Sequence, residues 1–259
     1  MNIPTMADLT ARGEVPEVLF WVGCAGSFDD RARKITKAFA KLLTAANVKF
    51  AVLGAEESCT GDPARRAGNE FLFQMQAMQN ISVLNGYGVK RIVSACPHCF
   101  NTLKNEYPVL GGIYEVMHHT QFINALLKEG RLKIEGGSFK GKRIVFHDPC
   151  YLGRGNGEYE APREILEKLD IELVEMKRSR QHGLCCGAGG AQMFKEAEPG
   201  KKEVNVERTE EAIGTGSQII AAGCPFCMTM LTDGVKHFSK ESVIRVKDIA
   251  ELVAEAADL

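Results

Sequence analysis

The feature that most constrains this chain is a cysteine pattern that occurs twice, once in each half of its 259 residues. Cys24 and Cys59 lie 35 positions apart, and so do Cys150 and Cys185. Each half then closes with the motif Cys-Pro-x-Cys: Cys96 to Cys99, and Cys224 to Cys227. Matched spacing of this kind indicates an internal duplication, so the chain is predicted to contain two similar folding units.

The joint between the two units is predicted within residues 130–143, which are rich in Gly and Lys and have no sustained apolar period. The first unit is therefore expected over residues 17–135 and the second over residues 136–259. Residues 1–16 are expected to form a polar N-terminal arm. A hydrophobic content of 45% is enough for one large core or for two of ordinary size.

Strands and helices are predicted to alternate in both units. The expected strands cover residues 18–23, 49–53, 91–95, 114–118, 143–146, 172–176, 218–222 and 243–246. The expected helices cover residues 29–46, 69–84, 100–107, 121–128, 162–169, 204–213, 228–235 and 248–257. Phe71, Met75 and Met78 are expected to be core residues. This alternation favours an α/β fold of two tandem units, each a small, mostly parallel sheet with flanking helices.

Ligand sites of parallel sheets gather at the carboxyl ends of the strands. The cysteines at predicted strand ends are Cys24, Cys96, Cys150 and Cys224, and those in a loop after another strand are Cys59, Cys185 and Cys186. The fold should therefore bring the cysteines of each unit to one edge of its sheet, which places the metal sites at the strand carboxyl ends.

Nine cysteines are an odd number, and the N-terminal residues lack the basic start and apolar core of a signal peptide. A reducing compartment is therefore expected, in which thiolates more often bind iron–sulfur clusters, zinc or Cu(I) than form disulfides. The first candidate ligand set is Cys24, Cys59, Cys96 and Cys99, and the second is Cys150, Cys185, Cys186, Cys224 and Cys227. Zinc or an ordinary cubane cluster takes four ligands. A fifth indicates an unusual cluster or a reactive thiol.

Several alternatives stay open at this point. Ser58 precedes Cys59 where a second cysteine would complete a pair, and the spacing does not decide whether Cys59 corresponds to Cys185 or to Cys186. Structural zinc and a thioredoxin-like dithiol are alternatives to iron–sulfur clusters, although a dithiol would leave most of the cysteines unused. His98 and His147 lie beside candidate ligands, where each could tune a cluster or be structural.

The order Cys, long gap, Cys-Cys-Gly, long gap, Cys-x-x-Cys resembles the CCG cysteine-rich domain, which occurs twice in one of the subunits of heterodisulfide reductase. The resemblance covers nearly the whole chain from about Pro16. Strings such as ESCTGDPARRAG, HDPCYLGR and CCGAGGAQMF are also similar to the C-terminal part of iron–sulfur oxidoreductases linked to electron-transfer flavoprotein and menaquinone. This resemblance implies an iron–sulfur electron-transfer subunit with one 4Fe-4S cluster in each unit, the second of either the cubane or the non-cubane kind.

The same resemblance implies partners and a place in the cell. Electrons would arrive from a flavoprotein or ferredoxin-type partner and pass toward a quinone through a partner, and a membrane iron–sulfur subunit would hold the chain at the inner face of the cytoplasmic membrane. It also leaves open a heterodisulfide or disulfide reductase that uses the five-cysteine site as its reaction centre. A zinc-stabilised interaction module is the third hypothesis. The net charge of −1 and scattered Lys and Arg give no basis for nucleic-acid binding. No acid–base group stands out, so catalytic residues stay unassigned.

Overall fold

The computed structural model describes residues 3–134, 137–196 and 199–259. Within these residues, the strands form two four-stranded, fully parallel sheets of the same topology, β2-β1-β3-β4 and β6-β5-β7-β8. The strands are β1 Val18–Trp21, β2 Phe50–Ala51, β3 Arg91–Ser94, β4 Glu115–His118, β5 Arg143–Phe146, β6 Glu172–Val174, β7 Ile219–Ala222 and β8 Arg245–Asp248. The predicted α/β fold of two tandem parallel units is confirmed. The predicted boundary at 135/136 lies outside the described residues.

Helices connect the parallel strands, as parallel pairing requires. In the first half they are α1 Met6–Ala11, α2 Gly23–Phe28, α3 Ala32–Ala45, α4 Asp62–Arg66, α5 Glu70–Gly86, α6 Pro97–Asn101 and α7 His119–Lys128. In the second half they are α8 Gly153–Asn156, α9 Glu160–Glu167, α10 Val204–Gly214, α11 Pro225–His237 and α12 Ile249–Ala256. Shorter turns are η1 Gly54–Glu56, η2 Thr102–Glu106, η3 Tyr107–Leu110, η4 Arg180–His182 and η5 Gln192–Phe194.

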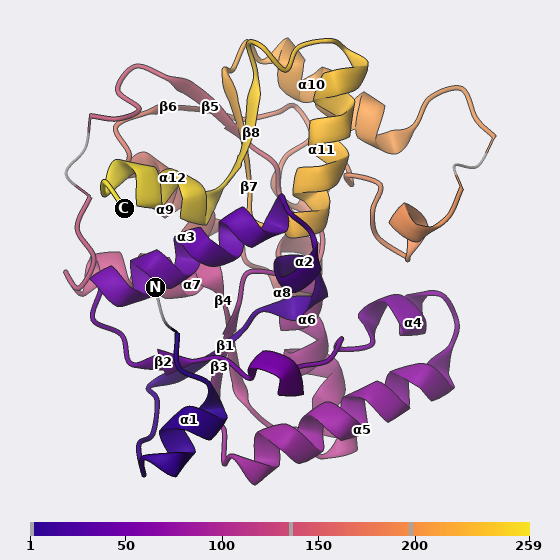
Figure 1. The fold of residues 1–259 in the computed structure, drawn as a ribbon. Helices are drawn as coiled ribbons and strands as arrows, with labels where there is room; N and C mark the ends of the chain where they lie inside the picture. Colours follow the sequence, from indigo (N-terminus) through magenta and orange to yellow (C-terminus); the bar gives the residue numbers. More distant parts are fainter. Residues whose placement is uncertain (1–2, 135–136, 197–198) are drawn as a thin grey trace.

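The layer between the two sheets is formed by helices from both units (Figure 1). Helix α3 of the first unit packs against α12 of the second, and α7 of the first packs against α9 of the second. One buried apolar core therefore contains Phe39 of α3, Phe122 of α7, Ile165 of α9 and Leu252 of α12. The two units share this core, because each inner helix buries its apolar face against a helix of the other unit.

Each unit departs from the predicted boundaries at places where a helix directly follows a strand. Strand β1 ends at Trp21 because Gly23 adopts a positive φ of 77° and opens α2. Helix α6 begins at Pro97 and α11 at Pro225, both earlier than predicted. Proline suits this first helical position because its missing N–H would have no partner there. The two Cys-Pro-x-Cys motifs therefore each open a helix.

Residues 3–16, the described part of the predicted N-terminal arm, contact the first unit. They contain α1, in which Met6 and Leu9 are buried, and Thr5 forms a parallel bridge to Val52 beside β2. A Thr5–Asp8 capping box begins this helix. The segment is polar overall, but Met6 and Leu9 are three residues apart and therefore lie on one face of the helix.

Helix α5 presents apolar side chains to solvent. Phe73, Ala77, Ile81 and Leu84 form its buried stripe, whereas Phe71, Met75 and Met78 are 75%, 54% and 62% exposed. The expectation that these three residues belong to the core is wrong. Helix α5 carries apolar residues on more than one face, so periodicity alone does not identify the face that packs against the sheet.

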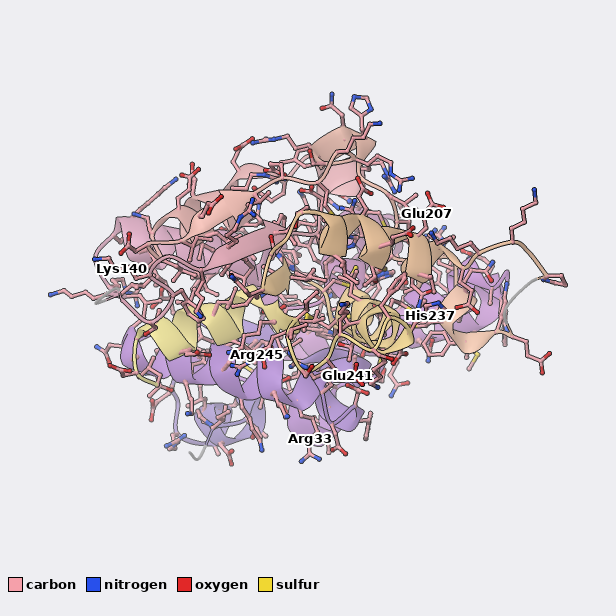
Figure 2. All side chains as sticks on the ribbon, turned by 90° about the horizontal axis from the view of Figure 1, so that it is seen from above. Arg33, Lys140, Glu207, His237, Glu241 and Arg245 are labelled. Atoms are coloured by element: carbon pink, nitrogen blue, oxygen red, sulfur yellow. The ribbon has the colours of Figure 1, made fainter. Side chains whose placement is uncertain are left out.

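None of the helices within the described ranges combines the length and the apolar character needed to cross a membrane. Basic and acidic side chains occur together on the face shown in Figure 2, where Arg33 and Arg245 are labelled with Glu207 and Glu241. This mixture agrees with the near-zero net charge.

Candidate metal centres

All nine cysteines are free thiols, and the structure gathers them into two groups. The first cysteine group contains Cys24 in the first turn of α2, Cys59 in the loop after β2, and Cys96 and Cys99 at the start of α6. Cys24 hydrogen-bonds to Cys59, which raises the pKa of Cys24 and lowers that of Cys59 to about 7. Cys96 hydrogen-bonds to Cys99, whose pKa is raised by this bond, by burial and by the charges of the other three. The four thiols therefore converge, as the strand ends predict.

The second cysteine group forms one continuous chain of thiol contacts. Cys150 hydrogen-bonds to Cys185, Cys185 to Cys186, Cys186 to Cys227, and Cys227 to Cys224. The bonds from Cys150 and Cys186 lower the pKa of Cys185. All five predicted members are therefore brought together at the carboxyl ends of β5 and β7 and in the loop after β6.

The structure decides which cysteine of the pair corresponds to Cys59. The backbone N–H of Gly61 lies 3.4 Å from Cys59 Sγ, and that of Gly187 lies 3.3 Å from Cys185 Sγ. Both glycines have a positive φ, 88° and 91°, which non-glycine residues rarely adopt. Cys59 therefore matches Cys185.

It follows that Thr60 matches Cys186. The Thr60 hydroxyl lies 3.8 Å from Cys99 Sγ, just as Cys186 contacts Cys227. The position of the absent fifth cysteine is Thr60, and the interpretation that assigned it to Ser58 is wrong. Ser58 instead hydrogen-bonds through its hydroxyl to the Asn80 side chain at 2.9 Å.

His98 links the two cysteine groups. It lies in the first unit between Cys96 and Cys99, yet its ring stacks on Tyr151 at 4.3 Å and meets Phe226 edge-on at 5.0 Å, both in the second unit. Its Nδ1 lies 2.8 Å from Asp62. Burial opposes the charged form, but hydrogen bonds to Asp62 and to Cys224 raise the pKa of His98 well above its usual value.

That same contact acts on the second group. Burial raises the pKa of Cys224, but hydrogen bonds from Cys227 and His98 outweigh this effect and lower the pKa to about 5. A residue on the turn that carries two thiols of the first group thus stabilises a thiolate of the second. His98 is therefore more than a turn residue, because it joins the two sites through one buried side chain.

His147 and Asp148 support the second group from the end of β5. A ring nitrogen of His147 lies within 4.8 Å of the sulfurs of Cys186 and Cys227. Burial and the nearby Arg208 guanidinium lower the pKa of His147 to about 3, so the ring is neutral. Asp148 is held by buried Arg163 at 2.8 Å and accepts from the Arg180 backbone N–H at 2.7 Å. Asp148 thereby ties the Cys150 turn to the segment that leads to Cys185.

Three further polar residues near the cysteine motifs have partners other than the sulfurs. His182 is exposed and meets Gln181 rather than the cysteine pair. Arg66 pairs with Asp62 at 3.0 Å and Arg65 pairs with Glu70 at 3.1 Å. No sequence pattern pointed to Arg208, which belongs to α10 and lies outside every cysteine motif.

The donor sets suit sulfur-bridged metal clusters. Each group offers soft thiolate ligands, and backbone N–H groups of Gly61 and Gly187 face the sulfurs. Gly23 leaves space beside the first group, because a Cβ at that position would lie 3.3 Å from Cys99 Sγ. Four thiols also satisfy zinc, whereas the five of the second group exceed the four ligands of a structural zinc site.

Three curated proteins show what this chain is similar to. It is 48% identical over 256 residues to the probable iron-sulfur-binding oxidoreductase FadF of Bacillus subtilis, covering 98% of this chain and 36% of FadF. It is 42% identical over 252 residues to the EtfAB:quinone oxidoreductase of Syntrophomonas wolfei, covering 95% and 35%. It is 35% identical over 254 residues to a subunit of the dihydromethanophenazine:CoB–CoM heterodisulfide reductase of Methanosarcina barkeri, covering 94% and 59%. The chain thus spans about a third to three fifths of the length of these relatives.

The family model of the CCG cysteine-rich domain matches this chain twice, over residues 18–104 and 144–232. Each match ends within or just after the Cys-Pro-x-Cys helix of its unit and so contains every cysteine of that unit. The resemblance predicted from the motifs is therefore confirmed, and this chain belongs to the CCG cysteine-rich domain family, with two copies of the domain.

Proposed function

We propose that this chain is the iron–sulfur electron-transfer part of a membrane-associated oxidoreductase, with one 4Fe-4S cluster at each cysteine group. The observation that carries this proposal is the convergence of nine buried or partly buried thiols into two groups that a single histidine connects. The names of the relatives, an iron-sulfur-binding oxidoreductase and a quinone oxidoreductase, support it.

The four thiols of the first group would hold an ordinary cubane cluster, since a cubane takes four cysteine ligands. The five thiols of the second group would hold the other cluster, of the cubane or the non-cubane kind. When bound, such clusters supply one-electron transfer. The chain's own contribution is to bury the sites, to donate backbone N–H groups to the sulfurs, and to connect the sites through His98.

The partners are part of the same proposal. Electrons would come from a flavoprotein or ferredoxin-type protein and leave toward a quinone through a membrane iron–sulfur partner, which would also hold the chain at the inner face of the cytoplasmic membrane. The relative named EtfAB:quinone oxidoreductase supports this direction of flow. Because this chain covers only 35% of that relative, the quinone-binding part would belong to a segment or subunit beyond the matched region.

The first experiment is anaerobic purification followed by iron, sulfide and zinc analysis and EPR of oxidised and reduced samples. About eight irons with matching sulfide would support two four-iron clusters. About four irons would restrict the proposal to one site. Stoichiometric zinc without iron would overturn it in favour of a zinc-stabilised module.

Variants then assign the sites. Cys227→Ser removes a thiol of the second group and should abolish the second cluster's EPR signal while the first remains. Cys99→Ser is the matched change at the equivalent position and should do the reverse. Iron content at the wild-type level in both variants would contradict the ligand assignment.

A second candidate function is a disulfide or heterodisulfide reductase. It is favoured by the five-thiol group and by the similarity to a heterodisulfide reductase subunit. Reduction of a small organic disulfide by the cluster-loaded chain, with a reduced dye as electron source, would support this function. Absence of turnover in a sample whose clusters the dye reduces fully would exclude it for the isolated chain.

A further inference from the structure

Trp21 and His147 occupy the same position in the two units. Phe20 pairs with Val93 in the first sheet, and Phe146 pairs with Ala221 in the second. Val93 and Ala221 each lie three residues before the first cysteine of a Cys-Pro-x-Cys motif. The next residue along each first strand, Trp21 or His147, therefore stands at an equivalent place, three residues before Cys24 or Cys150.

Both side chains carry a nitrogen without a partner. Trp21 and His147 are each 0% exposed, and among the described residues neither Trp21 Nε1 nor His147 Nε2 has a hydrogen-bond partner. Buried donors in folded proteins are nearly always satisfied, so two such nitrogens at equivalent positions require an explanation. An unpartnered ring nitrogen at the same position of both units indicates an acceptor of the same kind at both sites.

The tautomer of His147 is fixed by its other nitrogen. Arg208 Nε donates to His147 Nδ1 at 2.9 Å, and a guanidinium can only donate. His147 Nδ1 must therefore accept, so the proton of the neutral ring is on Nε2. Arg208 is held in turn by the Arg178 carbonyl at 2.8 Å and by Glu211 at 3.1 Å. The free nitrogen of His147 is thus a donor and, without losing that proton, cannot serve as a metal ligand.

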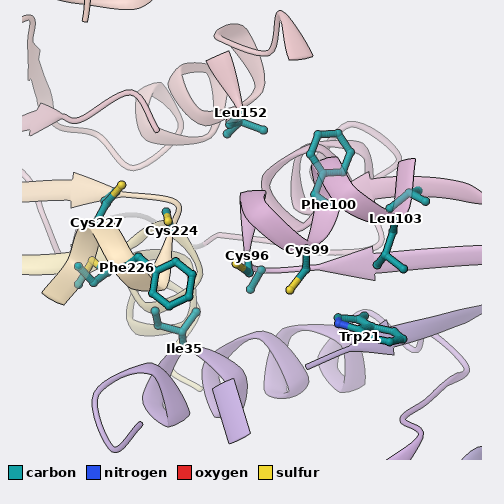
Figure 3. Packing of buried hydrophobic residues seen from close by; sticks show 14 of the residues in the cluster. Trp21, Ile35, Cys96, Cys99, Phe100, Leu103, Leu152, Cys224, Phe226 and Cys227 are labelled. Carbon is teal, nitrogen blue, oxygen red and sulfur yellow. The ribbon is translucent and has the colours of Figure 1, made fainter. Parts of the chain in front are cut away.

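The sulfurs are the acceptors within reach. A ring nitrogen of His147 lies within 4.8 Å of the sulfurs of Cys186 and Cys227. Trp21 belongs to the same buried core as Cys96 and Cys99, and in Figure 3 the nitrogen-bearing edge of its indole is on the side of Cys99. Each orphaned N–H is therefore placed beside the cysteine group of its own unit.

We propose that Trp21 and His147 each donate an N–H to the sulfur atoms of the cluster bound in their own unit, and that each thereby raises that cluster's reduction potential. This inference rests on the proposed function. The positive end of the N–H dipole stabilises the more negative, reduced state, and hydrogen bonds to sulfur are among the factors that set cluster potentials. Both are positioning and tuning residues rather than ligands.

Isotope labelling tests the contacts in the unaltered protein. The chain has one tryptophan, so ¹⁵N-indole-labelled tryptophan reports on Trp21 alone. Electron–nuclear double resonance of the reduced protein should show a weak ¹⁵N coupling at the first cluster. With ¹⁵N-histidine it should show a weak coupling at the second cluster, part of which disappears in His147→Gln when that variant carries the same label. A strong coupling typical of a coordinated nitrogen, or no coupling that depends on position 21 or 147, would overturn the proposal.

Potentiometry separates the two sites. Trp21→Phe keeps an aromatic ring but removes the N–H, and should shift only the first cluster's potential to a lower value. His147→Leu should lower only the second cluster's potential, whereas His147→Gln retains an N–H near the position of Nε2 and should restore most of the shift. Unchanged potentials in fully loaded Trp21→Phe and His147→Leu would overturn the inference.

Iron and sulfide are measured in every sample, so that the two proposals fail differently. A wild-type protein without iron would overturn the proposed function and this inference together. Normal iron and sulfide without the expected couplings or shifts would overturn this inference alone.

Discussion

Thr60 and Cys186 are the residues at which the two cysteine groups differ. Each follows the matched cysteine and precedes a glycine with positive φ, and each contacts the last cysteine of its unit. The backbone around them is therefore the same, and a single side chain decides whether a group offers four thiols or five. The residue at this position therefore accounts for the difference between the two proposed clusters.

Exchanging these residues tests that conclusion. Cys186→Thr should convert the second site to the four-thiol type, so its EPR spectrum should become similar to that of the first while iron content is kept. Thr60→Cys should give the first site a fifth thiol and should change the first cluster's EPR spectrum. Ser58→Cys is the control, because the Ser58 side chain is hydrogen-bonded to Asn80 and a thiol there is not expected to reach the first cysteine group. A response to Ser58→Cys but not to Thr60→Cys would contradict the match.

The nine cysteines and their division into two groups were predictable from the sequence, because the spacing repeats and strand ends converge. The identity of Thr60 was not. The gap before the Cys185–Cys186 pair favours one alignment with Cys59, but the gap after it is longer in the second unit than in the first, so spacing could not place the insertion. The glycine that stands two residues after both Cys59 and Cys185 is the sequence signal that could have found it, and the matched N–H contacts of Gly61 and Gly187 establish it.

At the scale of single elements, the turn from β1 into α2 depends on Gly23. Its φ of 77° is in the left-handed region, and a Cβ would lie 3.3 Å from Cys99 Sγ. Gly23→Ala should cost about 1–2 kcal/mol of the free energy of unfolding through the backbone alone and should also alter the first cluster's visible and EPR spectra. Urea denaturation and both spectra would measure this.

Gly13→Ala is the matched control for that change. Gly13 has a similar φ of 67°, but nothing lies within 4 Å of the place that a Cβ would take. It should lose a similar amount of stability while the cluster spectra stay unchanged. Equal spectral effects of the two substitutions would show that the approach to Cys99 is unimportant.

Helix α5 offers a test of which apolar stripe faces inward. Phe73 is 1% exposed and Met75 is 54% exposed, although they lie only two residues apart. Phe73→Ala should therefore lower the free energy of unfolding by about 3–5 kcal/mol, because it leaves a cavity. Met75→Gln should change it by less than about 0.5 kcal/mol. Chemical denaturation followed by far-UV circular dichroism would compare them, and a large loss in Met75→Gln would indicate that this face is covered.

For the whole molecule, the shared inner layer predicts that the two units unfold together. Leu252 of α12 is completely buried in a core that also contains α3 and α7 of the first unit, and Arg31 forms an ion pair with Glu251 across the same boundary at 2.6 Å. Leu252→Ala should cost about 2–5 kcal/mol. Because the units share this core, the substitution should lower the unfolding midpoint of both units.

The single tryptophan makes that prediction measurable. Trp21 lies in the first unit, so its fluorescence reports the unfolding of that unit although the substitution is in the second. The fluorescence midpoint should shift in Leu252→Ala together with the circular dichroism midpoint. Leu72→Ala, at a position 40% exposed, should move neither by much. A fluorescence midpoint that stays at the wild-type value in Leu252→Ala would show that the units unfold independently.

The sequence by itself determined the duplication, the alternation of strands and helices, the two groups of cysteines and the family. These features follow from the spacing of cysteines and the periodicity of apolar residues, which can be read directly along the chain. Tertiary structure decided what depends on contacts between distant segments: the helix layer shared by the two units, the inward face of α5, and the approach of His98 to Cys224. Such contacts join residues far apart in the chain. No local pattern in the sequence records them, so they are known only from the folded structure.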